Sequence, residues 1–180
     1  MRPVSRALVA ALLLVVAGCA QLAFLQPTDG LRFELSGRIA VKYGDESSSG
    51  NLAWRHRHDG DEMLITSPLG QGIARIVRQG DAVTLTTSEP RDYHAANAEL
   101  LTEEVLGFRV PLVGLSDWVR GRPAPGPSRA RRDERGRLAE LEQSGWRIEY
   151  LAYGEDGQLP ARMRLLYPGL ELGLAISTWR

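Results

Sequence analysis

Residues 33–43 read FELSGRIAVKY, and Phe33, Leu35, Ile39 and Val41 alternate with polar or small residues along this stretch. A period of two is typical of a β-strand with one buried face, because successive side chains of a strand point to opposite sides of the sheet. The stretch therefore predicts a long strand that buries one face.

The same alternation recurs in short runs along the rest of the chain. Turn sequences separate several of them, such as Asp59-Gly60-Asp61 and Glu155-Asp156-Gly157. Such runs predict an antiparallel meander of about ten strands. One run places Ile73, Arg75 and Val77 on a common face. The runs lie at 52–56, 63–65, 73–77, 83–85, 146–150, 163–167 and 170–176.

The middle of the chain has a helical pattern instead. Residues 95–106 are rich in helix formers, and a second short helix is predicted over 112–120, where Leu115, Trp118 and Val119 share one face. These patterns predict an α+β fold that is mainly β: a large twisted antiparallel sheet with one apolar face, part of which short helices cover. Because the helical residues are few, they can cover only part of the apolar face. Two alternatives follow: an incompletely filled interior, or a well-packed core without a cavity.

The first residues resemble a secretory signal. Arg2 and Arg6 precede an apolar run of about ten residues, which is shorter than the roughly twenty needed to span a membrane. Val16-Ala17-Gly18 then leads to Cys19, the one cysteine of the sequence, which favours lipidation over a redox or buried role. We expect a signal peptide at 1–18, a lipidated tether at 19–30 and one folded domain at 31–180.

Composition and motifs exclude several classes of function. The 22 basic and 22 acidic side chains balance, and removal of two arginines with residues 1–18 leaves a net charge of minus two, so nucleic-acid binding is not indicated. No nucleophile elbow, phosphate loop or dinucleotide turn is present, and we expect no enzyme. His56 and His58 lack the further ligands of a metal site and are predicted to be solvated. The same is predicted for three glutamates, Glu99, Glu103 and Glu104.

Two segments have alternative interpretations. Ser67-Pro68-Leu69-Gly70 fits a β-turn with Leu69 at its tip, where the leucine either projects into solvent or folds back onto the sheet. Residues 122–132 combine prolines with arginines and form either a solvated loop, which we favour, or a basic patch that contacts anionic surfaces.

Several of these features, in this order, resemble the LolB family of outer-membrane lipoprotein receptors. The resemblance covers the whole chain and adds to the lipoprotein signal the motifs Leu35-Ser36-Gly37-Arg38-Ile39-Ala40-Val41, Gly50-x-x-x-Trp54, Ser67-Pro68-Leu69-Gly70-Gln71, Pro111-Leu112, Leu115-x-x-Trp118-Val119-x-Gly121-x-Pro123, Gln143-x-Gly145-Trp146-x-Ile148-x-Tyr150, Leu159-Pro160 and Trp179.

The resemblance implies that the antiparallel sheet curves into a half-barrel, with short helices covering its concave apolar side. It also implies a receptor at the periplasmic face of the outer membrane, with N-acyl and S-diacylglycerol groups on Cys19 and no other cofactor. It implies three partners: the periplasmic carrier LolA, lipoproteins with acylated N-termini, and outer-membrane phospholipid. We expect a monomer. Pro68, Leu69 and Gly70 would form a membrane-delivery loop. A scaffolding lipoprotein with a filled core is the alternative. The implied acyl-chain cavity is lined by Ile39, Val41, Trp54, Met63, Ile65, Trp118, Trp146, Ile148, Met163 and Leu172.

Overall fold

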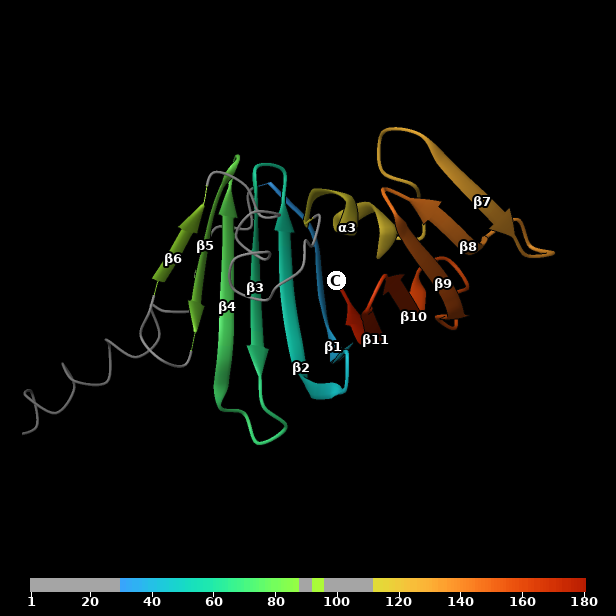
Figure 1. Ribbon diagram of the computed structural model, residues 1–180. Coiled ribbons are helices and arrows are strands. Elements are labelled where there is room, and N and C mark those ends of the chain that lie inside the picture. Colours follow the sequence, from blue (N-terminus) through green and yellow to red (C-terminus); the bar gives the residue numbers. More distant parts are fainter. Residues whose placement is uncertain (1–29, 88–91, 96–111) are drawn as a thin grey trace, which may run out of the picture.

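The computed structural model describes residues 30–87, 92–95 and 112–180, which form one large antiparallel sheet and one short helix (Figure 1). The helix is α3 (Leu112–Trp118). The strands are β1 (Leu31–Tyr43), β2 (Glu46–Arg57), β3 (Gly60–Thr66), β4 (Gly72–Gln79), β5 (Ala82–Thr87), β6 (Asp92–Ala95), β7 (Ser128–Arg132), β8 (Leu138–Gln143), β9 (Trp146–Tyr153), β10 (Pro160–Tyr167) and β11 (Leu170–Trp179).

The sheet consists of two meanders that meet at its centre. Its order is β6-β5-β4-β3-β2-β1-β11-β10-β9-β8-β7, so the first and last strands pair, with Ile39 opposite Leu174. The prediction of a single meander was therefore wrong in its connectivity. Because β6 and β7 are the two edges of the sheet, the chain between them, which includes α3, must connect one edge to the other.

One face of the curved sheet carries the core. Inward side chains from β1 to β5 and from β8 to β11 form one apolar cluster, to which Trp118 and Val119 at the end of α3 also belong. Figure 1 shows α3 in the space between the two halves of the sheet. This arrangement confirms the predicted half-barrel with a helix on its concave side, and it confirms that Leu115, Trp118 and Val119 share the buried face of the helix.

The strand connections that the structure describes divide into two sets at opposite ends of the strands. We name the first set the Leu69 rim; its connections are 44–45, 67–71, 144–145 and 168–169. We name the second set the far rim; its connections are 58–59, 80–81, 133–137 and 154–159. Gly30 and Arg180, the ends of the described chain, lie at the far rim.

The structure corrects three details of the predicted elements. In β4, Ile76 is buried and Ala74 half-buried, whereas Ile73 is 42% exposed, so the predicted face of this strand was wrong. Arg78 occupies an inward position there because Asp61 binds it. Within 122–132, the segment 128–132 is the fully exposed edge strand β7, not a loop. Ala95 ends β6, and the rest of the helix predicted over 95–106 lies outside the described residues.

Candidate functional site

The ten residues predicted to line a cavity all belong to the inward face. Ile39, Val41 and Ile65 are half-buried and pack against the core cluster. The other seven are buried members of that cluster: Trp54, Met63, Trp118, Trp146, Ile148, Met163 and Leu172. The structure therefore brings all ten to one apolar interior, shared by both halves of the sheet and α3.

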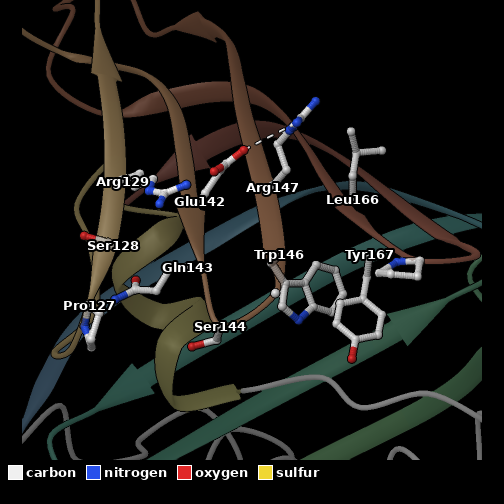
Figure 2. Close-up of a pocket in the computed structure, with 12 residues that line it drawn as sticks. Pro127, Ser128, Arg129, Glu142, Gln143, Ser144, Trp146, Arg147, Leu166 and Tyr167 are labelled. Atoms are coloured by element: carbon white, nitrogen blue, oxygen red, sulfur yellow. Dashed lines mark hydrogen bonds and ion pairs between the residues drawn. The ribbon is translucent and has the colours of Figure 1, made fainter.

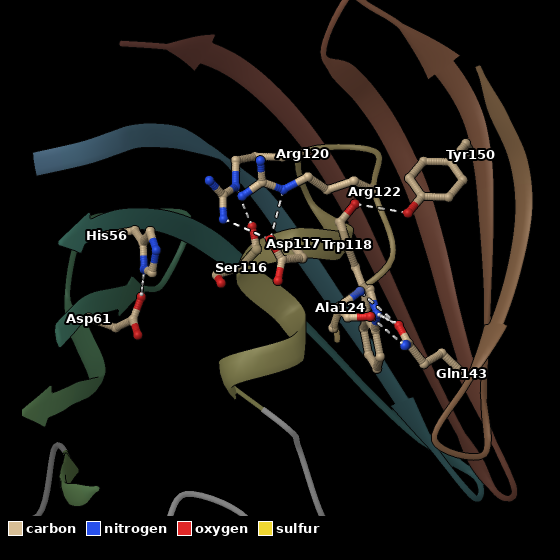
Figure 3. Close-up of polar contacts among 10 residues, drawn as sticks. All are labelled: His56, Asp61, Ser116, Asp117, Trp118, Arg120, Arg122, Ala124, Gln143 and Tyr150. Carbon is tan, nitrogen blue, oxygen red and sulfur yellow. Dashed lines mark hydrogen bonds and ion pairs between the residues drawn. The ribbon is translucent and has the colours of Figure 1, made fainter. Parts of the chain in front are cut away.

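Two polar side chains, those of Gln143 and Tyr150, hold the end of α3 and the segment after it against the C-terminal half of the sheet (Figure 3). The Gln143 side-chain oxygen accepts hydrogen bonds from Trp118 Nε1 at 2.8 Å and from the Ala124 amide at 2.9 Å, and its Nε2 donates to the Ala124 carbonyl at 2.8 Å. The Tyr150 hydroxyl donates to the Trp118 carbonyl at 2.9 Å. Burial raises the pKa of Tyr150, so this hydroxyl stays a donor at any physiological pH. One of the quoted motifs contains both Gln143 and Tyr150, but sequence reasoning did not predict these contacts, because the partners lie 19 to 32 residues away along the chain.

The interior is least well covered toward the Leu69 rim. Among the apolar side chains that are only partly buried against the core, the majority occupy strand positions near that rim. They are Ile39, Val41, Ile65, Ala74, Tyr93 and Tyr167. By contrast, residues near the far rim such as Phe33 and Trp54 are 5% and 1% exposed. Among the residues that the structure describes, the apolar interior is thus partly open at the end of the half-barrel that carries Leu69.

The loop between β3 and β4 presents Leu69 to solvent. The Gly70 amide donates to the Ser67 carbonyl at 2.9 Å, which closes a β-turn, and Gly70 adopts a positive φ of 86° that suits glycine. Ser67 Oγ accepts from the Gln71 amide at 3.2 Å and braces the turn. Leu69 is 90% exposed, the highest value of any large apolar residue that the structure describes. The predicted β-turn is confirmed, and the leucine projects outward.

A buried ionic cluster lies near the far rim, where sequence reasoning predicted solvated histidines. Asp61 accepts hydrogen bonds from Trp54 Nε1 at 2.8 Å and from Arg78 Nε at 2.7 Å, and its carboxylate lies 2.7 Å from Nδ1 of His56. Burial alone would raise the pKa of Asp61, but the bonds from His56, Trp54 and Arg78 outweigh it and hold that pKa below its ordinary value.

The prediction was therefore wrong for His56, which is 9% exposed and stacks on Phe33 at a centroid distance of 4.9 Å. His56 shares its side of β2 with Leu52 and Trp54, and that alternation was the signal for burial. His58 is exposed, as predicted.

An open groove that sequence reasoning did not predict lies at the Leu69 rim, where β7 and β9 begin and β8 and β10 end. The groove encloses about 680 Å3. Figure 2 shows Trp146 and Tyr167 side by side in it, with Glu142 and Arg147 on the other side of the strands. The two rings lie 5.1 Å apart between centroids, and Arg147 Nη2 lies 3.4 Å from Glu142 Oε1.

Other predicted features fall outside the described residues. These are Cys19 with the signal and tether, and the acids Glu99, Glu103 and Glu104. Within 30–87, 92–95 and 112–180, no group of three or more histidine, cysteine, aspartate or glutamate side chains is placed to hold a metal ion. No helix in these ranges is long and apolar enough to cross a bilayer.

Comparisons with known proteins agree on one family. The family model described as outer membrane lipoprotein LolB matches residues 31–179. Outer-membrane lipoprotein LolB of Pseudomonas fluorescens (strain Pf0-1) is 39% identical over 151 residues, which cover 82% of this chain and 74% of the relative. Its counterpart from Azoarcus sp. (strain BH72) is 36% identical over 191 residues, which cover 99% of this chain and 98% of the relative.

A solved structure with little sequence identity shares the fold. A DUF1329 family protein from Desulfovibrio piger ATCC 29098 superposes with a TM-score of 0.55 at 10% identity and covers 85% of this chain and 87% of that chain. A LolA superfamily protein from Nitrosomonas europaea gives a TM-score of 0.45 at 11% identity, over 86% of this chain and 87% of that one. On the sequence matches, which span nearly all the folded part, the chain belongs to the LolB family of outer-membrane lipoproteins.

Proposed function

We propose that this protein is a non-enzymatic receptor of the outer membrane that accepts lipoproteins from the periplasmic carrier LolA and releases them into the bilayer. The observation that carries the proposal is the apolar interior that is partly open at the same rim from which Leu69 projects. A receptor of this kind needs both parts, a shelter for acyl chains and a contact with the membrane that receives them.

The energetics favour passage through apolar surroundings. Each methylene moved from water to an apolar environment gains about 0.8 kcal/mol, so exposed acyl chains would cost tens of kcal/mol in transit. Transfer from one apolar interior to another and then to a bilayer exchanges similar environments, and a small affinity difference suffices to drive it. The ten inward residues are the proposed lining. Since seven of them are buried, acyl chains would enter by displacing side chains or α3.

We also propose that residues 1–18 are a signal peptide, that Cys19 carries the acyl groups, and that 19–30 form the tether. The family match supports this division, because it begins at residue 31. Such an anchor holds the protein to the outer membrane, where its LolB relatives are named as lipoproteins.

The first test follows a labelled lipoprotein from its carrier to the receptor. The mature chain with Cys19→Ala, which carries no acyl groups, is tagged and mixed with loaded carrier, and the label that co-purifies is measured. The label should move without nucleotide. If it stays on a carrier that is competent with another LolB protein, acyl-chain reception is wrong, and a scaffolding lipoprotein becomes the better account.

Matched variants locate the lining and separate the two steps. Ile39→Glu places a charge on the inward face and should block reception, whereas Ala40→Glu, the next residue on the convex face, should not. Leu69→Glu should spare reception but reduce delivery to liposomes about tenfold or more, an effect of roughly 1.4 kcal/mol. Gln71→Glu adds the same charge to the same exposed loop and is the control. Equal delivery by both loop variants would contradict the role of Leu69.

A further inference from the structure

The two rims of the half-barrel differ in charge. The four connections of the Leu69 rim that the structure describes contain eleven residues, of which only Asp45 is charged. The β5–β6 connection, 88–91, also joins two strands at this end; it lies outside the described residues and contains Glu89 and Arg91. The far-rim connections contain fifteen residues, of which eight are charged: Asp59, Asp81, Asp133, Glu134, Arg135, Arg137, Glu155 and Asp156. Turns exposed to water are ordinarily polar, so a row of nearly uncharged turns at one end needs a cause.

Exposed apolar side chains gather at the same end. The structure describes five large apolar residues that are exposed. Leu69 at 90% and Tyr43 at 45% lie in or next to connections of the Leu69 rim, and Ile73 at 42% lies near the same rim, one residue into β4 on the convex face. The other two, Leu64 and Leu151, lie on the convex face, and the far rim has none among the described residues.

Direct contacts join part of this rim into a continuous arc. The Gly44 amide donates to the Gly169 carbonyl at 3.2 Å, which places the β1–β2 and β10–β11 turns side by side. The β3–β4 loop lies on the other side of the β1–β2 turn, and Figure 1 shows both below the sheet. At roughly 4.8 Å between strands, the path from Leu69 through Tyr43 to Pro168 spans about 20 Å. The 144–145 turn is two strands further, where sheet twist turns the rim aside.

We propose that this arc, residues 43–45, 67–71 and 168–169, is the surface that rests on the phospholipid bilayer. It extends the proposed membrane contact from one leucine to a seat that aims the partly open side of the interior at the lipid. Leu69 enters deepest, and Tyr43, with a ring suited to the interface, and Pro168 lie at headgroup level. Because the only charge in the connections of this arc is acidic, the seat does not depend on anionic lipid or low salt.

Lipid depth measurements test the seat in the full mature, acylated protein. Cys19 is the one cysteine of the natural sequence and is blocked when acylated, so a single introduced cysteine can be labelled selectively. Leu69→Cys, Tyr43→Cys and Pro168→Cys report on the arc, and Asp59→Cys, Asp81→Cys and Asp156→Cys are matched exposed positions of the far rim. Each is labelled with bimane in phosphatidylethanolamine/phosphatidylglycerol vesicles, with or without acyl-brominated phospholipid.

We expect brominated lipid to quench the three arc positions and none of the far-rim positions, equally at low and high salt. Quenching at Leu69→Cys alone would reduce the contact to a single loop and overturn the proposal. Equal quenching at both rims would also overturn it. So would a change of bimane fluorescence at positions 43 and 168 that added carrier causes and vesicles do not. Hydrogen exchange of the unmodified protein provides a second readout: amides at 43–45 and 168–169 should be slowed on vesicles relative to detergent. Neither measurement involves cargo, so their failure is distinguishable from failure of lipoprotein transfer.

Discussion

Replacing Asp61 by asparagine, which has nearly the same shape, should greatly reduce the free energy of unfolding. The carboxylate of Asp61 has no solvent exposure, and the Arg78 side chain that it binds is only 12% exposed. Asp61→Asn keeps the volume but removes the charge. It also replaces one carboxylate oxygen by an NH2 group, which cannot accept the hydrogen bond of the donor that it faces, either Trp54 Nε1 or Arg78 Nε. The substitution therefore leaves a nearly buried guanidinium without its counter-ion.

The expected loss follows from that unpaired charge. Removing one partner of a buried ion pair costs about 3–5 kcal/mol, because the remaining charge keeps its desolvation penalty. The asparagine oxygen retains one hydrogen bond, so we expect the lower end, about 3 kcal/mol in the free energy of unfolding. For a domain of this size that corresponds to a fall in Tm of roughly 6–12 °C.

Urea unfolding followed by tryptophan fluorescence and by circular dichroism measures the loss. The control is Asp59→Asn, which removes the same charge from an exposed position in the adjacent turn and should change the free energy of unfolding by no more than about 0.5 kcal/mol. Equal midpoints for the two variants would refute the assignment of Asp61 as the centre of a buried ionic cluster.

The same residue fixes the sign of a pH effect. The pKa of Asp61 lies below its ordinary value of 3.8 in the folded protein, so the folded state binds its proton less readily than the unfolded chain does. Its contribution to stability is complete above pH 4 and is lost as the pH falls through the folded-state pKa. The difference in stability between the natural protein and Asp61→Asn should therefore persist at neutral pH and shrink below pH 4.

Three further outcomes are expected. Gln143→Leu leaves three polar groups of Trp118 and Ala124 without partners and should lower the free energy of unfolding by about 2 kcal/mol or more in urea; limited proteolysis should then cut between α3 and β7 faster. Tyr150→Phe removes one hydrogen bond and should cost about 1 kcal/mol, measured by thermal unfolding. Deletion of residues 20–25 should abolish quenching at Leu69→Cys in acylated protein, while reception from the carrier by the non-acylated chain is unchanged.

Local alternation was enough to predict the strands whose buried faces follow a strict period of two. It placed Trp54, Ile148 and Met163 correctly, since their nearest inward neighbours in the same strands, such as Leu52, Tyr150 and Leu165, are apolar. It missed β8, in which Leu138 and Leu141 both face inward at a spacing of three, next to an irregularity in the pairing with β7.

The remaining errors concern partners that lie far apart in the sequence. Arg78 faces inward because Asp61, 17 residues earlier, neutralises it. The inward face of β4 therefore carries Ile76 and Arg78, and the predicted face with Ile73 points outward. The pairing of β1 with β11 likewise depends on contacts across most of the chain. β7 is fully exposed and has no apolar alternation to detect. The ten proposed lining residues were correctly placed on one face. The difference in charge between the rims could not be predicted, because only the strand order shows which connections lie at the same end of the sheet.

The position of the chain's entry into the fold constrains how the proposed seat and anchor act together. Gly30 lies at the far rim and Leu69 at the other, separated by the length of β1, whose 13 residues span about 40 Å. The eleven peptide links from Cys19 to Gly30 reach at most about 40 Å. If the Leu69 rim rests on the membrane that holds Cys19, upright strands would demand a fully extended tether, which is entropically unfavourable. Inclining the strands brings Gly30 nearer the lipid and relaxes that demand. With the proposed anchor and the proposed membrane contact together, the short tether favours a tilted domain. In that orientation the arc from Leu69 to Pro168 contacts the lipid, and the charged far rim stays in water.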